Sequence, residues 1–529
     1  MKIIIWILVL NLFAITYSVS SNLGASHEAE YVGFESCKTC HPEIYLKWQT
    51  SLHSKVHNAA TPKFVLGDFR GTLTFKALKR IEVKLSFREN RYYVKLGDRE
   101  YEVLYTHGAG GWKQRYLTRI GSSLYVLPIQ WNTKTKEWVL SDYEVWFDQD
   151  GNPKEPLNED SYDVRCSGCH LTGLKLTQTK EEWVVTFKEM FVGCEACHGP
   201  GSDHVERDRT IFVDYGAQVC GRCHTRGTSL PEGIFGFSWK EKEREEVFPW
   251  EDYNSYFKEE PVIWDDGTSK MHRQQFNDWK KSEHSKALRN LKNNEYAKDY
   301  CLRCHSADYI LSKGEKPNLK EAKYGITCVV CHDPHASEFK RETRSESLNL
   351  CARCHTIDPS LSEEVPLHPQ IEMFVGSYHF VGGSECKNCH MPKMAESGTP
   401  FDSRIHTWEF KSPNLSLEIE GMPNSCNQDG CHFERDAKWS LERIEKWQSG
   451  IQKKLSEVEP LVEAAERALE GVEKGNEELD LALEMLEVAR IKASLAQRSK
   501  RVGISFLLPL VLLGFAILIY FSRIVTKKI

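Results

Sequence analysis

The sequence predicts a mainly α-helical and irregular fold with a small β-rich insertion, a C-terminal helical hairpin or stalk, and one transmembrane helix. The 18 cysteines of the 529-residue chain fall into nine closely spaced pairs. Residues 62–160 contain no cysteine and include alternating stretches rich in β-branched and aromatic residues. Residues 502–522 are 21 residues without a charge. The length allows two or three domains, and the net charge of −6 gives no reason to expect a nucleic-acid partner.

The cysteine pairs repeat one pattern. Eight read C-x-x-C-H, and a ninth, CNQDGCH, has four residues between its cysteines. C-x-x-C-H is the attachment motif of c-type haem, in which two thiols bond to the haem vinyl groups and the histidine is the proximal iron ligand. The predicted attachment residues are Cys37, Cys40, Cys166, Cys169, Cys194, Cys197, Cys220, Cys223, Cys301, Cys304, Cys328, Cys331, Cys351, Cys354, Cys386, Cys389, Cys426 and Cys431. The predicted proximal ligands are His41, His170, His198, His224, His305, His332, His355, His390 and His432.

Zinc sites or a disulfide framework are the alternatives for so many cysteines. Neither needs a histidine directly after every second cysteine, and the nine pairs leave no cysteine over for another role. We therefore expect haem c and its iron at the eight regular motifs. A ninth haem is expected at Cys426, Cys431 and His432, where the longer spacer has to bulge. The body is then predicted to have a multihaem cytochrome c fold, with porphyrins in place of an apolar core.

Histidines outside the motifs are numerous enough to supply the opposite side of each iron. Eleven remain of the 20 in the chain, and His27 lies just past a predicted signal peptide. Nine are predicted as distal ligands: His53, His57, His107, His204, His272, His284, His335, His379 and His406. His368 is the tenth spare histidine. Because the chain has only eight methionines, most haems are expected to be bis-histidine and of low potential, without the methionine ligation that raises it.

The body divides into two related modules. The segment W-x-x-S-x-H-S-K occurs at residues 48–55 and again at 279–286, and three C-x-x-C-H motifs follow each copy. We assign module A to residues 31–240, with four haems and the β-rich insertion at 62–160. Module B spans residues 255–435 and has five haems.

The start of module B keeps a histidine but not the cysteines. His272 lies seven residues before Trp279, as His41 does before its own tryptophan, whereas Thr268 and Met271 stand in place of the cysteines. His272 either ligates an iron held by another motif or is a remnant that only packs.

The two ends of the chain indicate export and membrane attachment. Residues 1–21 have the pattern of a signal peptide. Residues 436–500 show the spacing of a helical hairpin or stalk, which either packs on the body or forms a homo-oligomer contact. Residues 502–522 are long enough to cross a bilayer. The haem body is therefore expected on the extracytoplasmic side of the cytoplasmic membrane, periplasmic or at the cell surface, with a redox protein or a quinol-linked donor as partner.

Parts of both modules resemble known families. YVGFESCKTCHPEIYLKWQTSLHS, from residue 31, resembles the tetrahaem cytochrome family of ammonia oxidisers. Module B is similar to pentahaem nitrite reductase and octahaem hydroxylamine oxidoreductase. HPQIEMFVGSYHFVGGSECKNCHMPK, residues 368–393, is similar to the stretch before the last haem of the nitrite reductases. That resemblance implies distal ligands at His284 and His379, and pocket residues at His368 and Arg289.

Two functions follow from these features. The first is a membrane-anchored, extracytoplasmic cytochrome that transfers electrons through about nine mostly bis-histidine haems. The second, which the resemblance implies, is an oxidoreductase acting on nitrite, hydroxylamine or a similar small nitrogen or sulfur compound. Its catalytic haem would be bound by Cys301, Cys304 and His305, with His368 and Arg289 supplying protons and anion stabilisation.

Overall fold

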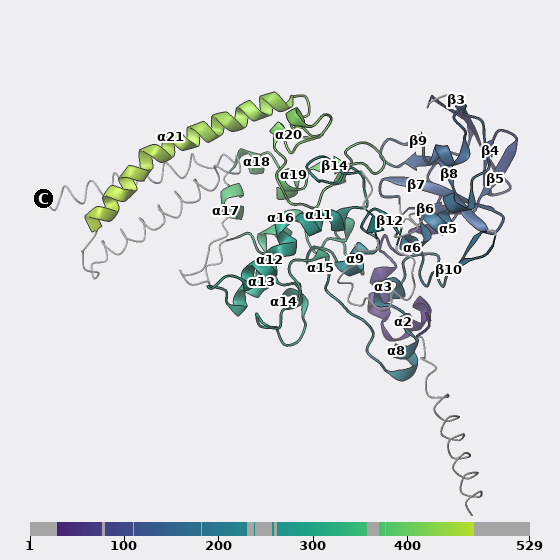
Figure 1. The fold of residues 1–529 in the computed structure, drawn as a ribbon, viewed down its shortest axis with the longest axis horizontal. Coiled ribbons are helices and arrows are strands. Elements are labelled where there is room, and N and C mark those ends of the chain that lie inside the picture. Colours follow the sequence, from purple (N-terminus) through teal and green to yellow (C-terminus); the bar gives the residue numbers. More distant parts are fainter. Residues whose placement is uncertain are drawn as a thin grey trace, which may run out of the picture.

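The computed structural model describes residues 29–76, 80–108, 110–180, 182–229, 237, 257–258, 262–356, 370–375 and 377–469. In Figure 1, the β-rich part lies at one end of the body and the helices that carry most cysteine motifs lie in the middle. A long helix extends from the opposite side of the body (Figure 1). The predicted combination of helical and irregular structure with a β-rich insertion is confirmed.

Two antiparallel sheets form the β-rich insertion. One has the strand order β1-β6-β7-β8-β9 and the other β2-β3-β4-β5. The strands are β1 His57–Ala59, β2 Gly71–Lys76, β3 Arg80–Arg88, β4 Arg91–Leu96, β5 Arg99–Val103, β6 Tyr105–His107, β7 Lys113–Ile120, β8 Ser123–Asn132 and β9 Glu137–Leu140. The sheet starts before residue 62 because β1 pairs with β6.

Alternation of apolar and polar residues builds the core of the insertion. On β3, Ile81, Val83 and Leu85 are buried and the residues between them are exposed, as the period of two predicts. These side chains pack in one cluster with the fully buried Trp146. A second cluster joins β7 and β8 to the helix that precedes the Cys166 motif, so the insertion is fixed to module A by apolar packing.

Short helices carry most of the cysteine motifs. These helices are α2 Phe34–Cys40, α6 Ser167–His170, α7 Glu195–His198, α9 Gln218–Gly221, α13 Leu302–His305, α15 Cys328–Cys331, α16 Ser347–Ala352 and α19 Cys386–His390. The helices between them are α3 Pro42–Trp48, α4 Tyr143–Trp146, α5 Tyr162–Arg165, α8 Ser202–Arg207, α11 Gln275–Lys281, α12 Glu283–Lys292, α14 Ala307–Leu311, α17 Gln370–Val375, α18 Tyr378–Val381 and α20 Pro413–Glu418. Short 3-10 turns lie at Asn158–Asp160, Asp299–Cys301 and Lys340–Glu342.

Three two-stranded ribbons complete the described structure of the body. They are β10 Lys175–Gln178 with β11 Trp183–Thr186, β12 Thr228–Ser229 with β13 Phe257–Lys258, and β14 Lys393–Ala395 with β15 Ser403–Arg404. Three clusters of buried apolar residues in the described part of module B have three or four members each. Each is smaller than either of the two clusters that involve the β-rich insertion.

The long helix is α21, Ala437–Leu469, which has Pro460 inside it. It covers the first part of the predicted stalk at 436–500. The rest of the stalk, the predicted signal peptide at 1–21 and the predicted span at 502–522 lie outside the described residues. Within the described residues, no helix has both the length and the apolar character needed to cross a membrane.

Candidate functional site

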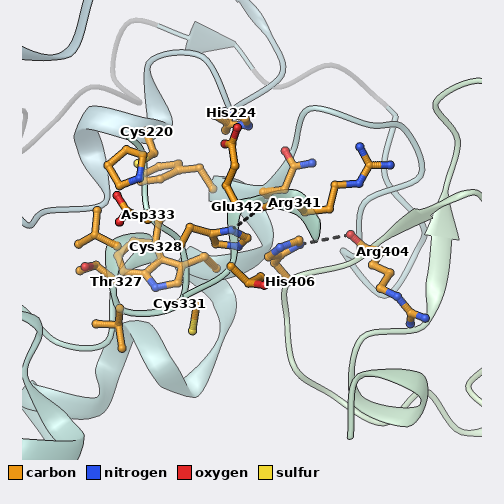
Figure 2. A pocket seen from close by; sticks show the side chains of 18 of the residues that line it. Cys220, His224, Thr327, Cys328, Cys331, Asp333, Arg341, Glu342, Arg404 and His406 are labelled. Carbon is orange, nitrogen blue, oxygen red and sulfur yellow. Dashed lines mark hydrogen bonds between the residues drawn. The ribbon is translucent and has the colours of Figure 1, made fainter. Parts of the chain in front are cut away.

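One continuous cavity connects all nine cysteine motifs. Its volume is about 4680 Å³, and both cysteines and the histidine of every motif line it. A pocket for one small ligand is about 300–1,000 Å³, so this space suits several large groups. Figure 2 shows one part of it, where Cys220 and His224 from module A lie beside Cys328 and Cys331 from module B.

The local backbone places the two thiols and the histidine of a motif together. In the motifs at Cys37 and Cys220, the histidine N–H donates to the carbonyl of the first cysteine over 2.9 Å. One helical turn therefore brings both cysteines and the histidine to the same side. CNQDGCH has the same hydrogen bond across a larger loop: the His432 N–H donates to the Cys426 carbonyl over 3.2 Å. Gly430 has a φ of 81° there, which supplies the predicted bulge.

Most motif histidines face a second histidine across the cavity. An imidazole–metal bond is about 2 Å long and the ring centre lies about 1 Å behind the ligating nitrogen, so two imidazoles on opposite sides of one metal have centroids about 6 Å apart. Five pairs have this separation: His41 and His204 (6.3 Å), His53 and His224 (6.3 Å), His198 and His335 (6.1 Å), His284 and His355 (6.0 Å), and His379 and His432 (6.3 Å). This spacing fits one iron between each pair.

Backbone carbonyls orient several of these imidazoles. The Nδ1 atom lies within hydrogen-bond distance of a carbonyl oxygen in His198 (2.7 Å to Phe212), His204 (2.7 Å to Arg209), His332 (3.0 Å to Arg341), His272 (3.1 Å to Glu396) and His406 (3.2 Å to Arg404). A carbonyl only accepts, so Nδ1 carries the proton and the lone pair of Nε2 is left for a metal. The dashed lines in Figure 2 end at Arg341 and Arg404, two of these carbonyls.

Burial keeps these imidazoles in the form that binds iron. Removal from water lowers the pKa of His272 and His406 to about 3 and that of His224 and His284 to about 4. At neutral pH all four are therefore uncharged, and a neutral imidazole is the metal-binding species. His406 also lies close enough to His332 for their charges to interact, which makes these two a further candidate pair.

Three histidines meet at the motif that begins at Cys166. His107 and His57 lie directly opposite each other on β6 and β1, and the His107 Nδ1 and His57 Nε2 atoms are 3.0 Å apart. The His170 ring lies 4.5 Å from His107 and 6.2 Å from His57, measured between centroids. The distance to His107 is too short for an iron between the two rings, so binding of one iron by both would require them to separate.

Sulfur atoms of different motifs touch. Hydrogen-bonding contacts join the thiols of Cys37 and Cys194, Cys220 and Cys328, Cys351 and Cys386, and Cys304 and Cys354. Thioethers at these positions would bring the edges of two haems together. In the described part of the chain, no three side chains of His, Cys, Asp or Glu converge as a zinc ion would need.

Cationic side chains line the cavity near His272. Lys113, Arg115 and Arg273 all belong to its wall. Burial, followed by repulsion from Arg115, lowers the pKa of Lys113 to about 7. The Arg273 Nε atom is buried without a hydrogen-bond partner. Each haem carries two propionate carboxylates, and an anion of this kind would satisfy these groups. The wall therefore fits the charge of haem as well as its size.

Of the two pocket residues implied by the nitrite-reductase resemblance, Arg289 lies within the described residues. Arg289 is exposed on α12 and is not part of the cavity wall. His368 and His27 lie outside the described residues. By contrast, no pattern in the sequence indicates Lys113, Arg273 or the carbonyls that orient the imidazoles, because none of them belongs to a motif.

Three family models match parts of the chain. Cytochrome c552 matches residues 365–505, a doubled CXXCH motif matches 320–358, and cytochrome c554 and c-prime matches 132–199 and 269–333. These matches agree with the motifs in indicating covalently bound haem c. They do not include the stretch from residue 31 that resembles the ammonia-oxidiser family, so that closer relationship stays a prediction. No curated protein matches the chain.

Two solved structures are similar over most of the chain. The outer cell wall cytochrome OcwA is 25% identical, with a TM-score of 0.71, covering 92% of this chain and 99% of that one. An undecahaem cytochrome from the S-layer of Carboxydothermus ferrireducens is 19% identical, with a TM-score of 0.54, covering 94% of this chain and 70% of the other. The second likeness concerns the fold alone.

Proposed function

We propose that this chain, a multihaem c-type cytochrome, conducts electrons through nine haems. One observation carries the proposal: all nine motifs line a single cavity, and sulfur atoms of different motifs are in contact. Haems attached at touching sulfurs have adjacent edges, which a continuous electron path requires. The chain's own residues attach, orient and enclose the haems, and the haem irons supply the redox chemistry.

The contacts order the motifs differently from the sequence. Electrons would pass from the Cys37 motif to Cys194, then through the Cys220, Cys328, Cys351 and Cys386 motifs. The thiol contacts do not cover two of these steps, but Cys197 lies within electrostatic range of Cys220, and Cys331 within electrostatic range of Cys351. Cys389 lies within electrostatic range of Cys431, which adds the last motif to this path. The motifs at Cys166 and Cys301 are side branches. The Cys169 sulfur contacts the Arg222 carbonyl within the Cys220 motif, and the Cys304 sulfur contacts Cys354.

The path ends at two exposed positions. Of all 18 cysteines, Cys40 and Cys431 are the exposed ones, and they belong to the first and the last motif of the path. The haems attached there would be the most accessible to other molecules. We therefore propose that electrons enter at one of these haems and leave at the other.

Most of the irons are proposed to have two histidine ligands. Seven motifs support two histidine ligands for their iron. Five have a facing pair, the Cys328 motif has the candidate pair of His332 and His406, and the Cys166 motif has His57 and His107 beside it. His272 presents a free Nε2 to the cavity and is proposed to ligate an iron held by another motif. Such haems have lower potentials than histidine–methionine haems.

The haem body is proposed to lie outside the cytoplasm. The two similar structures are named as an outer cell wall and an S-layer cytochrome, and covalent haem attachment takes place outside the cytoplasm. The apolar residues 502–522 are proposed to anchor this body to the cytoplasmic membrane, with a redox protein or quinol-linked donor beside it.

The catalytic alternative has less support. It requires a substrate site at the haem of Cys301, Cys304 and His305, with His368 and Arg289 beside it. Because Arg289 is exposed and is not part of the cavity wall, the arrangement favours electron transfer. A high-spin ferric signal that changes on addition of nitrite or hydroxylamine would reverse this preference.

The test compares a main-path haem with a side-branch haem. One variant carries Cys220→Ser and Cys223→Ser, and the matched control carries Cys166→Ser and Cys169→Ser. Both proteins, with the unmodified full chain, are adsorbed on an electrode, and the current delivered to ferric citrate is measured. We expect the current to fall steeply without the Cys220 haem and to persist without the Cys166 haem. Equal currents in the two variants would contradict the proposed path.

A further inference from the structure

The hydrogen bonding of His107 differs from that of the other oriented histidines. Elsewhere the Nδ1 atom faces a backbone carbonyl, as in His198, His204, His272, His332 and His406. In His107 it faces the Nε2 atom of His57 over 3.0 Å. The Nδ1 atom of His57 in turn lies 3.0 Å from the Met190 carbonyl oxygen. A chain of two imidazoles therefore runs from this carbonyl to His107.

Strand pairing and packing fix this geometry. His57 on β1 and His107 on β6 are directly opposite in the antiparallel register, so their side chains leave the same face of the sheet. The Gly108 N–H donates to the Val56 carbonyl over 2.7 Å and closes the ladder beside them. The fully buried Tyr162 ring packs edge-on against both imidazoles, 5.4 Å from His57 and 5.5 Å from His107 between centroids.

The chain of contacts determines where each proton is. The Met190 carbonyl only accepts, so the Nδ1 atom of His57 carries a proton. If His57 is neutral, its Nε2 accepts from the Nδ1–H of His107, and the Nε2 of His107 is left with a lone pair. If His57 were charged, its Nε2–H would donate to His107 instead, and the proton of neutral His107 would sit on Nε2. Only the first arrangement lets His107 bind iron while both contacts are kept.

We infer that His57 is a positioning residue and not an iron ligand. It accepts the Nδ1–H of His107, which binds the iron of the Cys166 haem opposite His170. This inference rests on the proposed function, because it requires haem at that motif. It gives His57 a role other than the predicted distal ligand, because both ring nitrogens of His57 are already engaged.

The contact with His57 should make His107 donate more electron density to the iron of the Cys166 haem than a carbonyl-bonded histidine would. A hydrogen bond from the noncoordinating nitrogen makes a ligating imidazole more basic and tunes the metal. An imidazole nitrogen is a stronger base than a backbone carbonyl, so His107 is expected to be a more electron-rich ligand than a carbonyl-bonded histidine. A more electron-rich ligand stabilises the ferric state, so His57 should lower the reduction potential of the Cys166 haem.

The competing assignment is that His57 itself binds the iron. Its ring lies 6.2 Å from His170 between centroids, a spacing that would fit a shared metal, whereas His107, at 4.5 Å, has to move away from His170 to share one. To bind through Nε2, His57 would have to give up the contact with His107. To bind through Nδ1, it would have to leave the Met190 carbonyl without its donor. The two assignments predict different spectra when each histidine is replaced.

The experiment uses the full chain with its haems attached. His57→Phe removes the acceptor, His57→Gln keeps one through its amide oxygen, and His107→Phe removes the proposed ligand. Haem content is counted by mass spectrometry of the peptide that contains Cys166. Low-temperature electron paramagnetic resonance during a potentiometric titration then gives the spin state and the potential of each haem. The haem that changes in His107→Phe identifies the Cys166 haem in the other samples.

We expect His107→Phe to create one high-spin haem. We expect His57→Phe to keep that haem low-spin and to raise its potential, with the other haems unchanged and with His57→Gln restoring most of the shift. A high-spin haem in both His57 variants, or an unshifted potential in His57→Phe, would overturn the inference alone. A peptide with Cys166 but no haem would overturn the proposed function at this motif, and the inference with it.

Discussion

Modules A and B share their internal contacts far beyond the cysteine motifs. The indole N–H of Trp48 donates to the Val192 carbonyl over 3.1 Å, and that of Trp279 donates to the Ile326 carbonyl over 2.7 Å. Each carbonyl lies two residues before a motif cysteine, Cys194 in module A and Cys328 in module B. The sequence repeat is therefore also a repeat of tertiary contacts.

The correspondence continues at the side branches and at the distal ligands. The sulfur of Cys169 contacts the Arg222 carbonyl over 3.8 Å, and the sulfur of Cys304 contacts the Arg353 carbonyl over 3.9 Å. Both arginines occupy the same position in the third motif of their module's triplet. The candidate distal ligands match as well: His53 faces His224, and His284 faces His355.

The modules differ at their first haem. In module A, the Cys37 thiol touches Cys194, whereas the thiol that touches Cys328 in module B comes from Cys220. Cys220 belongs to the last motif of module A. The position that the Cys37 motif holds in module A is thus taken in module B by a motif of the preceding module. If haems are attached at Cys220 and Cys328, the row of haems has no gap at the point where Thr268 and Met271 stand in place of cysteines.

The largest expected effect comes from removing matched ligands. His53→Ala and His284→Ala should each convert one low-spin haem to high-spin, at Cys220 and Cys351 respectively, because each loses an axial ligand. Electron paramagnetic resonance of the oxidised proteins measures this, and Lys55→Ala, on the same segment, is the control that should change nothing. A high-spin signal in only one of the two histidine variants would break the equivalence of the modules.

Replacing His272 by alanine tests the start of module B, where the two modules differ. With Nδ1 on the Glu396 carbonyl, His272 has the orientation of the other candidate ligands. We therefore include His272→Ala in the same series and expect a high-spin haem. Spectra identical to those of the unmodified chain would instead identify His272 as a remnant of the lost motif that only packs.

Local chemistry made the haem motifs predictable. A C-x-x-C-H motif carries its attachment and its proximal ligand within five residues, so no knowledge of the fold was needed to name Cys37 or His41. The alternation on β3 likewise indicated a strand. The start of the sheet at His57 was missed, because β1 exists only through its pairing with β6.

Pairing of ligands was less predictable, because it depends on distant segments. Nothing local to His198 indicates that His335 of the other module faces it. A count of spare histidines placed His57 among the ligands, whereas its contacts with Met190 and His107 are the basis of the positioning role that we infer for it. Arg289 was assigned by family resemblance alone, and the fold leaves it exposed.

A buried carboxyl group, that of Asp163 on α5, lies where the β-rich insertion packs on module A. Burial raises the pKa of Asp163 to about 6, although its Oδ2 accepts from the Leu124 N–H over 3.1 Å. The folded chain then binds more protons than the unfolded chain between about pH 4 and pH 6. Stability should therefore fall as the pH rises through this range and stay reduced above it.

Asp163→Asn removes this dependence and keeps an oxygen acceptor for Leu124. At pH 7 the variant should be more stable than the unmodified chain by up to about 3 kcal/mol, the equivalent of roughly two pKa units. Urea unfolding followed by circular dichroism at pH 4.5, 5.5 and 7 tests this, with the exposed Asp299 of module B, changed to Asn, as the control. A difference between Asp163→Asn and the unmodified chain that does not vary with pH would contradict the explanation.

The smallest effect is expected at the matched tryptophans. Trp48→Phe and Trp279→Phe remove one indole donor each and leave the carbonyl of Val192 or Ile326 without it. An unsatisfied buried acceptor costs about 1–3 kcal/mol. Because the two contacts correspond, the urea midpoints of the two variants should fall by similar amounts.

The matched control is Trp138→Phe, which loses a hydrogen bond to the Asp68 carbonyl in the β-rich insertion. It should leave the Soret spectrum of both modules unchanged. If only Trp48→Phe lowered the midpoint, the Trp279 contact would be a remnant of the repeat and not a support for the Cys328 motif.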